Sequence, residues 1–136
     1  MTDRIARSQT LARFDMPTPP KDLVVRRIRG MGRGVFADRA FRRGEVIEVC
    51  PVLHLPSGTP PDGLEHYVFK WGADGKELAV ALGYGSLYNH SPTPNATFTT
   101  RYARAEVVFR ATRVIAAGEQ ILIDYRWDES EYGGFA

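Results

Sequence analysis

The chain contains very little cysteine, and this scarcity excludes two ways of stabilising a small protein. Its 136 residues include one cysteine, Cys50, which lies inside an apolar run. A single thiol cannot form an intrachain disulfide, and it cannot build a cysteine-rich zinc cluster. We therefore expect Cys50 to be a buried thiol, and we expect no bound metal ion.

Long hydrophobic runs are also missing from the sequence. No apolar stretch approaches the roughly 20 residues that a membrane-spanning helix needs. The N-terminus, where Asp3, Arg4 and Arg7 precede any apolar stretch, lacks the hydrophobic core of a secretory signal. The hydrophobic content of 43% and the charged content of 25% are ordinary for a soluble globular protein of one domain. We therefore expect a soluble, cytoplasmic protein.

The net charge of +2 is small but unevenly distributed. The chain up to Glu45 has eleven Lys or Arg against five Asp or Glu, whereas the remainder has seven against eleven. A basic front can contact nucleic acid or an acidic partner, but solvated surface arginines produce the same pattern. Both explanations stay open, and we do not expect nucleic acid to be the direct substrate.

Patterns typical of strands dominate the chain, and helical periodicity is scarce. Glycine and proline divide it at the spacing of an all-β fold. The expected strands are residues 23–28, 35–37, 45–55, 77–82, 96–102, 106–115 and 120–125. Residues 64–71 favour a short helix, and Asp74-Gly75 predicts a hairpin turn. Residues 1–20 lack periodicity and end in prolines, so we expect a mobile N-terminal tail, a domain over residues 21–136 and a short C-terminal tail.

Residues 32–37 (GRGVFA) match a G-x-G-x-x-A dinucleotide-binding fingerprint. A dinucleotide-binding turn opens a helix of ten or more residues, whereas here Gly44 interrupts early and β-branched residues follow it. The sequence therefore disfavours that interpretation. A plain glycine turn between two strands is the simpler alternative, and such a turn also lets backbone N–H groups approach a carboxylate ligand.

Two further motifs carry the most information when they are taken together. Residues 85–95 (GSLYNHSPTPN) predict a polar loop that enters a strand, and residues 118–125 (GEQILIDY) predict an apolar strand ending in Asp-Tyr. Alone, the loop would be explained by turn residues that satisfy their own backbone. In this order behind the glycine turn, the motifs resemble the SET domain of protein lysine methyltransferases. The resemblance spans about residues 23–125 and is strongest to minimal SET domains without zinc modules, including a viral histone methyltransferase with a run similar to residues 81–85 (ALGYG).

The resemblance implies a mainly β fold of the SET (β-clip-like) type, with several small sheets and minor helix. In that family the Asn-His segment tucks beneath the strand that carries Asp-Tyr, which gives a knot-like crossing near the C-terminus. The implied activity is protein-lysine N-methylation with S-adenosylmethionine as cofactor. The implied partner is a protein that presents a lysine, with histone-like and ribosomal proteins as candidates, and the protein would be a monomer or a homodimer. The alternative is a noncatalytic SET-like module that binds a peptide or partner.

By resemblance, each implied role falls on particular residues of this chain. Tyr125 is the catalytic tyrosine, and Tyr67 is grouped with it as a catalytic-site aromatic that helps line the lysine channel. The alternative for Tyr67 is an aromatic on a short amphipathic helix that packs into the core. The implied cofactor-binding residues are Gly32, Arg33, Gly34, Asn89 and His90. The substrate-channel candidates are Tyr84, Ile123, Trp127 and Tyr132, with Phe135 as a further aromatic that could close the channel. Ile123 stands where an aromatic often influences the number of methyl groups added, so that number stays open.

Lysine methylation requires the neutral amine, although a lysine pKa near 10.4 leaves almost all of it protonated at pH 7. An aromatic channel and the positive sulfonium of the cofactor both lower that pKa. A tyrosine at position 125 stays protonated at neutral pH. We therefore expect its hydroxyl to orient the amine by hydrogen bonding, in preference to acting as a base. The acidic residues Asp128, Glu129 and Glu131 could attract a basic substrate.

Overall fold

The computed structural model describes residues 20–30 and 32–126. The predicted tails therefore lie outside the described residues, except for Pro20. The strands are β1 (Leu23–Ile28), β2 (Gly32–Ala37), β3 (Val46–Leu55), β4 (Val68–Trp71), β5 (Glu77–Ala81), β6 (Asn89–His90), β7 (Ala96–Arg101), β8 (Glu106–Ala111) and β9 (Leu122–Ile123). The one helical element within these ranges is the 3-10 turn η1 (Tyr102–Arg104), so the predicted mainly β fold is confirmed.

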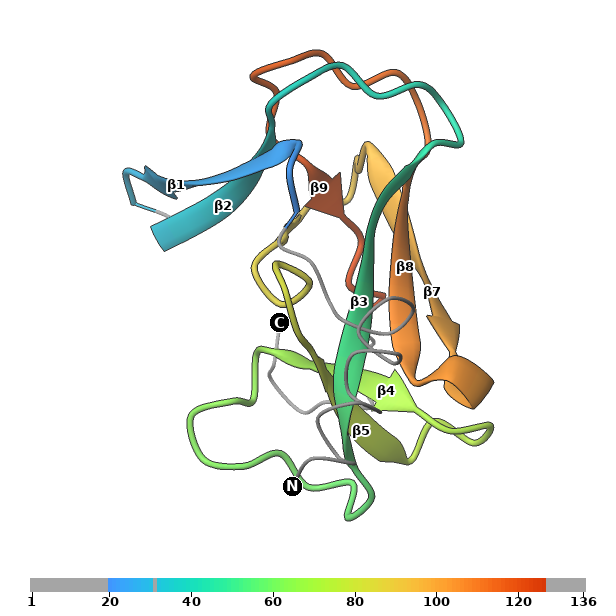
Figure 1. Ribbon diagram of the computed structural model, residues 1–136. Coiled ribbons are helices and arrows are strands. Elements are labelled where there is room, and N and C mark those ends of the chain that lie inside the picture. Colours follow the sequence, from blue (N-terminus) through green and yellow to red (C-terminus); the bar gives the residue numbers. More distant parts are fainter. Residues whose placement is uncertain (1–19, 31, 127–136) are drawn as a thin grey trace, which may run out of the picture.

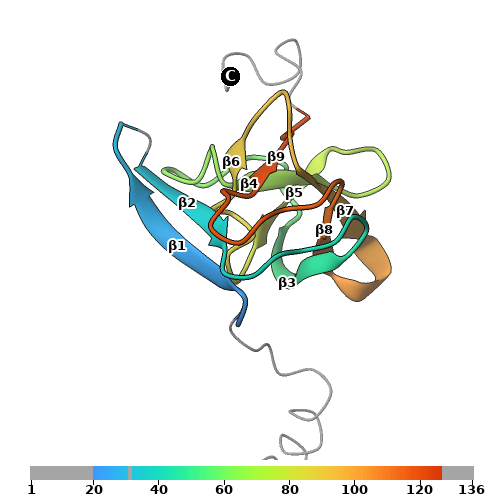
Figure 2. The ribbon, with the colours of Figure 1, turned by 90° about the horizontal axis from the view of Figure 1, so that it is seen from above.

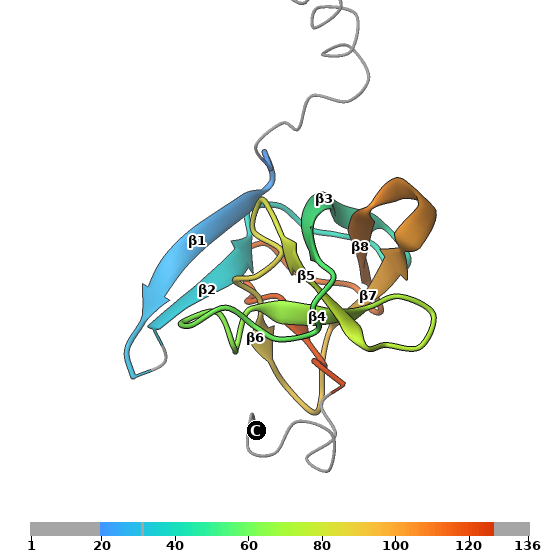
Figure 3. The same cartoon turned by 90° about the horizontal axis from the view of Figure 1, so that it is seen from below.

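The strands form three separate sheets (Figure 1). A five-stranded sheet in the order β4-β5-β3-β8-β7 makes up the body of the domain. β1 and β2 pair antiparallel as a ribbon on one side, and all three ribbon views place it away from the five-stranded sheet (Figure 2, Figure 3). β6 and β9 form a short parallel pair. No helix in the described part of the chain is long and apolar enough to cross a membrane.

β3 joins the two halves of the large sheet because it is long enough to pair with two partners. Its first part pairs with β8 and its second part with β5, and the register shifts between Val46 and Glu48. Beyond this shift, Glu48 and Cys50 face the interior. Cys50 is buried and free, which confirms the prediction of a buried thiol. Burial, with the nearby negative charge of Glu48, raises the pKa of this thiol above its ordinary value.

The hydrophobic core lies where the sheets meet. Its largest fully buried apolar side chains are Tyr88, Phe41, Phe109, Ile115, Ile121 and Ile123. Phe41 and Ile115 belong to long connections that also pair with each other through an isolated bridge. The connections are therefore part of the packed structure, and the core extends from the five-stranded sheet to the short β9 strand.

The predicted helix over residues 64–71 is wrong. The segment begins as a turn, in which the Tyr67 N–H donates to the Leu64 carbonyl, and then becomes β4, which pairs along its length with β5. A helix of eight residues gains too few hydrogen bonds to offset its nucleation cost, and the Val, Phe and Trp of this segment suit a strand. The predicted hairpin turn that follows is confirmed, because Gly75 adopts a φ of 69° and lies between β4 and β5.

Three other boundaries differ from the predictions. β2 begins at Gly32 and not at the predicted Val35, and its continuation as a strand excludes the helix that a dinucleotide-binding turn requires. β8 ends at Ala111, and β9 is only two residues long. The connection between them leaves the sheet because it pairs through single bridges instead, Ile115 with Phe41 and Gln120 with Phe36.

Candidate active site

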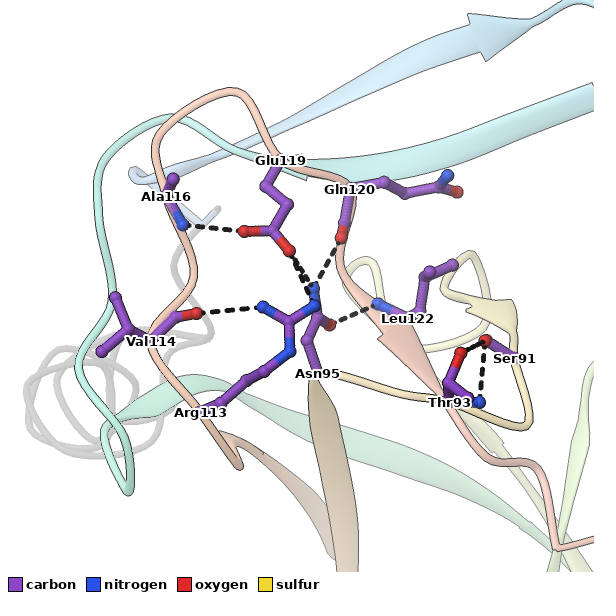
Figure 4. Close-up of polar contacts among 9 residues, drawn as sticks. All are labelled: Ser91, Thr93, Asn95, Arg113, Val114, Ala116, Glu119, Gln120 and Leu122. Atoms are coloured by element: carbon purple, nitrogen blue, oxygen red, sulfur yellow. Dashed lines mark hydrogen bonds and ion pairs between the residues drawn. The ribbon is translucent and has the colours of Figure 1, made fainter.

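Asn95 fixes the path of the chain that leads to the C-terminal tyrosine. Its side chain is 1% exposed, and its Nδ2 donates to the Gln120 carbonyl at 2.8 Å and to Glu119 Oε2 at 3.2 Å (Figure 4). Its Oδ1 accepts from the Leu122 N–H at 2.8 Å. Because a buried amide needs its hydrogen-bonding groups satisfied, this side chain couples the start of β7 to the entry of β9.

The parallel pair β6–β9 completes this crossing. Asn89 lies opposite Leu122, and His90 lies opposite Ile123. Beyond the pair, the Ser91 N–H donates to the Ile123 carbonyl at 2.9 Å. Two segments far apart in the sequence are thus bound together along a few residues, and this crossing corresponds to the knot-like feature that the resemblance implied.

The crossing holds Tyr125 at two points. Its backbone N–H donates to Nδ1 of His90 at 3.0 Å, and its hydroxyl donates to the backbone carbonyl of Tyr88. Burial raises the pKa of Tyr125 to about 12, and a negative charge on nearby Tyr67 would add to that rise. The hydroxyl is therefore protonated at neutral pH. Since its proton is directed at a carbonyl, the tyrosine oxygen presents its lone pairs to any group in the site.

A buried carboxylate lies behind Tyr88. The Tyr88 hydroxyl donates to Glu48 Oε1 at 2.6 Å, and the Tyr84 N–H donates to Glu48 Oε2 at 2.9 Å. Tyr88 is 1% exposed, and burial together with the charge of Glu48 raises its pKa well above the ordinary value. Sequence analysis missed this network, although one charged residue inside the otherwise apolar β3 was a signal of it.

A cavity of about 310 Å³ opens on one side of Tyr125. Its lining residues are Gly32, Arg33, His66, Tyr67, Ser86, Leu87, Asn89 and Tyr125.

The two glycines of the turn beside this cavity, Gly32 and Gly34, are required for different reasons. Gly32 has a φ of 83°, which only glycine adopts readily, and a Cβ there would meet no atom within 4 Å. Gly34 is packed so closely that a Cβ would lie 2.5 Å from Gln120 Oε1 and 2.6 Å from Ile28 Cδ1.

A second cavity, of about 160 Å³, adjoins the first and is lined by aromatic rings together with polar and charged residues, among them Lys70, Thr100 and Arg126. Its Tyr and Phe side chains are Tyr67, Phe69, Tyr88, Phe98, Tyr102 and Tyr125. Phe69 and Phe98 meet edge to face, with their centroids 5.0 Å apart. Arg126 covers Phe98, with its guanidinium 4.0 Å from the ring centroid and Nη2 donating to the Phe98 carbonyl at 2.6 Å.

The two cavities share a wall. Tyr67 and Tyr125, together with His66 and Ser86, line both of them. Tyr67 is 41% exposed, and its carbonyl accepts from Ser86 Oγ at 3.2 Å. A polar cavity and an aromatic cavity therefore meet at a pair of tyrosines, which is a geometry suited to passing a small group from one ligand to another.

The structure brings together five of the residues that the resemblance indicated. Gly32, Arg33, Asn89, Tyr67 and Tyr125 all line the polar cavity. Gly34 lies behind that cavity and lets Asn89 approach, so that the Asn89 amide donates to the Arg33 carbonyl at 2.9 Å. Sequence analysis missed Phe69 and Phe98, whose signal was only an aromatic on each of two separate strands.

Other indicated residues lie elsewhere. His90 lines neither cavity and instead accepts the Tyr125 N–H, so the geometry gives it a positioning role, and its cofactor contact stays a prediction. Tyr84 and Ile123 also line neither cavity, because the Tyr84 backbone binds Glu48 and Ile123 is fully buried. The geometry therefore does not support their predicted channel role. Trp127, Tyr132 and Phe135 lie outside the described residues.

Comparison with known proteins agrees with this fold. The model of the SET domain family matches residues 32–126, so the chain belongs to this family. A histone-lysine N-methyltransferase of Schizosaccharomyces pombe, specific for H3 lysine-37, is 29% identical over 124 residues and covers 85% of this chain and 83% of its own length. A crystal structure of a candidate histone methyltransferase from Plasmodium falciparum superposes with a TM-score of 0.68 and 28% identity, covering 79% of this chain and 96% of that one. The predicted family and fold are confirmed.

Proposed function

We propose that the protein is an S-adenosylmethionine-dependent protein-lysine N-methyltransferase. Family membership supports methyltransferase activity, and one observation in the structure carries the finer proposal. A polar cavity and an aromatic cavity share Tyr67 and Tyr125, so a cofactor in the first and a lysine side chain in the second would meet at these tyrosines.

The polar cavity has the chemistry that the amino-acid part of S-adenosylmethionine needs. Arg33 supplies a cation for a carboxylate, and the turn at Gly32 leaves the space that a side chain would take. Both N–H groups of the Asn89 amide are used within the protein, by the Arg33 carbonyl and Gln120 Oε1. Its Oδ1 is therefore the atom of this amide that can accept an N–H from the ligand. When bound, the cofactor supplies an electrophilic methyl group on a positively charged sulfur.

The aromatic cavity is suited to a lysine side chain. Removing an ammonium from water into an apolar environment lowers its pKa and raises the share of neutral amine. The rings of Phe69, Phe98 and Tyr88 supply apolar surface there, and the cations of Lys70 and Arg126, which also line the cavity, disfavour a further positive charge. Narrow walls also restrict the orientation of the amine, and positioning of this kind contributes several kcal/mol in enzymes, on the order of 7–11 kcal/mol at best.

Tyr125 orients the amine in this proposal. Its hydroxyl proton is donated to the Tyr88 carbonyl, so its oxygen accepts an N–H of the amine. With a pKa raised to about 12, Tyr125 remains a neutral hydrogen-bonding group at physiological pH and is no general base there.

The proposed substrate is a basic, histone-like protein. The fission-yeast relative acts on histone H3, and this supports the same class of substrate here. The acidic residues Asp128, Glu129 and Glu131, which were expected to attract a basic substrate, lie outside the described residues. The cytoplasmic location, ribosomal proteins as substrates, and a monomeric or homodimeric state stay predictions.

The test measures methyl transfer from methyl-labelled S-adenosylmethionine to histones, ribosomal proteins and total cellular protein. Tyr125→Phe removes the oxygen that orients the amine, so turnover should fall on the order of 100-fold while cofactor affinity is kept. Tyr84→Phe is the matched control, because it removes the same atom from a ring that lines neither cavity.

Label on a lysine that is lost in Tyr125→Phe and kept in Tyr84→Phe would support the proposal. Cofactor binding without transfer to any of these proteins would favour the noncatalytic binding module instead. Absence of cofactor binding would contradict the proposed use of the polar cavity.

A further inference from the structure

The ribbon formed by β1, Arg29 and β2 is strongly basic. We call it the basic ribbon, and it comprises Leu23–Ile28, Arg29 and Gly32–Ala37. It carries four exposed arginines and no Asp or Glu in those residues. The arginines are Arg26, Arg27, Arg29 and Arg33. None of them forms an ion pair with any residue in the described part of the chain.

Two of these arginines face each other across the ribbon. Arg27 lies opposite Arg33 in the antiparallel register, and like charges at directly opposite positions destabilise a strand pair. Elsewhere the protein does place carboxylates beside arginines: Arg39 contacts Glu45 at 2.6 Å, and Arg113 contacts Glu119 at 2.9 Å. Arg33 is given to the polar cavity, so Arg27, with its exposed neighbours Arg26 and Arg29, remains for an anionic partner on the surface.

The shape of the ribbon indicates which class of anionic partner it can bind. The ribbon is paired with no strand of the large sheet, and its base is buried in the core through Leu23, Val35 and Ala37. Its far end, which carries the four arginines, is exposed and extends from the body of the domain (Figure 2, Figure 3). Successive residues of a strand point to opposite faces, so Arg26 and Arg27 lie on different faces of the ribbon. Arg26 lies over Phe36, with its guanidinium 5.6 Å from the ring centroid.

The major groove of B-form DNA admits a two-stranded ribbon between two rows of phosphates. We propose that the basic ribbon binds double-stranded DNA, with Arg26, Arg27 and Arg29 contacting phosphates on both sides of the groove. Arg33 is assigned to the polar cavity and is not needed for this contact. The proposal goes beyond the proposed methyl transfer and does not depend on it.

Two other nucleic-acid partners suit the ribbon less well. The major groove of A-form RNA is too narrow for a protein element of this kind. Single strands are bound mainly by stacking bases on exposed aromatic rings. The one aromatic residue of the basic ribbon, Phe36, is half-buried and has Arg26 over it.

The experiment measures binding of the full chain to a fluorescent 20-base-pair duplex by anisotropy, over a range of salt concentrations. Three phosphate contacts predict that log affinity falls with log salt with a slope of about −2.7. The variant Arg26→Glu/Arg29→Glu should weaken binding about tenfold or more and reduce the slope by about 1.8. The matched control Arg43→Glu/Arg104→Glu makes the same change in net charge at exposed arginines outside the basic ribbon.

The proposal predicts that the control variant keeps the slope and most of the affinity. Equal weakening in both variants, or tighter binding to single-stranded DNA or to duplex RNA, would overturn it. Affinity for S-adenosylmethionine and the thermal midpoint should be unchanged in the ribbon variant. If charge reversal impairs folding, Arg26→Gln/Arg29→Gln provides the same slope measurement without placing acidic groups on the ribbon, and an unchanged slope there would also overturn the proposal.

Discussion

The two tyrosines at the shared wall are held in place by very different means. Tyr125 follows β9, whose entry is bound by the buried Asn95, and it is hydrogen-bonded through both its backbone and its hydroxyl. Tyr67 lies in a turn, is 41% exposed, and is bound through its backbone to Leu64 and Ser86. Segments with little burial open locally at lower free energy than buried ones. The part of the shared wall that Tyr125 forms, which we call the fixed wall, is therefore held by a buried polar network. The part that Tyr67 forms, which we call the adaptable wall, can adjust to the ligand that enters.

Asn95→Ala should have the largest effect, because it removes the side chain that holds the fixed wall in place. The substitution removes three side-chain hydrogen bonds and leaves the Leu122 N–H and the Gln120 carbonyl buried without this partner. We expect the free energy of unfolding to fall by about 3–5 kcal/mol, measured by urea denaturation. Thr93→Ala, at an exposed position of the same loop, is the control and should change it by less than about 1 kcal/mol. Equal midpoints for Asn95→Ala and the wild type would show that the crossing does not depend on this side chain.

Glu48→Gln disturbs the same wall from behind. Glu48 accepts from two donors, the Tyr88 hydroxyl and the Tyr84 N–H. The amide of glutamine has one oxygen, so it can accept from one of these donors and would turn its own N–H groups toward the other donor. We expect a loss of about 2–3 kcal/mol in unfolding free energy. Because the Tyr88 carbonyl holds Tyr125, turnover should fall more than cofactor affinity does. Unchanged turnover would show that Glu48 does not contribute to the placement of Tyr125.

Ser86→Ala tests the adaptable wall. Ser86 Oγ contacts the carbonyls of Tyr67 and Ala81, at 3.2 and 3.0 Å. Its loss should cost about 1 kcal/mol of stability, since the Tyr67 carbonyl stays near solvent. Binding of a lysine peptide, measured by calorimetry, should weaken more than cofactor binding. A loss of stability as large as that of Asn95→Ala would contradict the distinction between the walls.

Alkaline pH should produce the smallest effect, and it acts on the fixed wall. Burial raises the pKa of Tyr125 to about 12 from its ordinary value of 10. The folded state therefore holds this proton more tightly than the unfolded state, and the associated stability is present below pH 10 and lost as pH rises through 12. Urea midpoints should fall between pH 9 and pH 11 more steeply for the wild type than for Tyr125→Phe. Parallel curves would show that Tyr125 is not desolvated.

The difference between the walls also explains what sequence could predict. Residues 89–95 and 118–125 form local motifs, so the family, the crossing and Tyr125 could be inferred from them. The role of Tyr67 was implied only by resemblance, and the helix predicted around it was wrong because pairing with β5 outweighs local periodicity. Phe69 and Phe98 could not be found, since they are brought together by pairing between strands that are distant in sequence. The cofactor contact of His90 was implied by resemblance and stays a prediction, whereas its hydrogen bond to the backbone of Tyr125 could be found only from the fold.

A crystal structure with S-adenosylhomocysteine and a lysine peptide of histone H3 would test the proposed site most directly. We expect the cofactor product in the polar cavity beside Gly32, Arg33 and Asn89, and the lysine side chain in the aromatic cavity. The amine should lie within hydrogen-bond distance of the Tyr125 oxygen. Both ligands in one cavity, or the cofactor product in the aromatic cavity, would contradict the proposal that methyl transfer takes place at the tyrosines that the two cavities share.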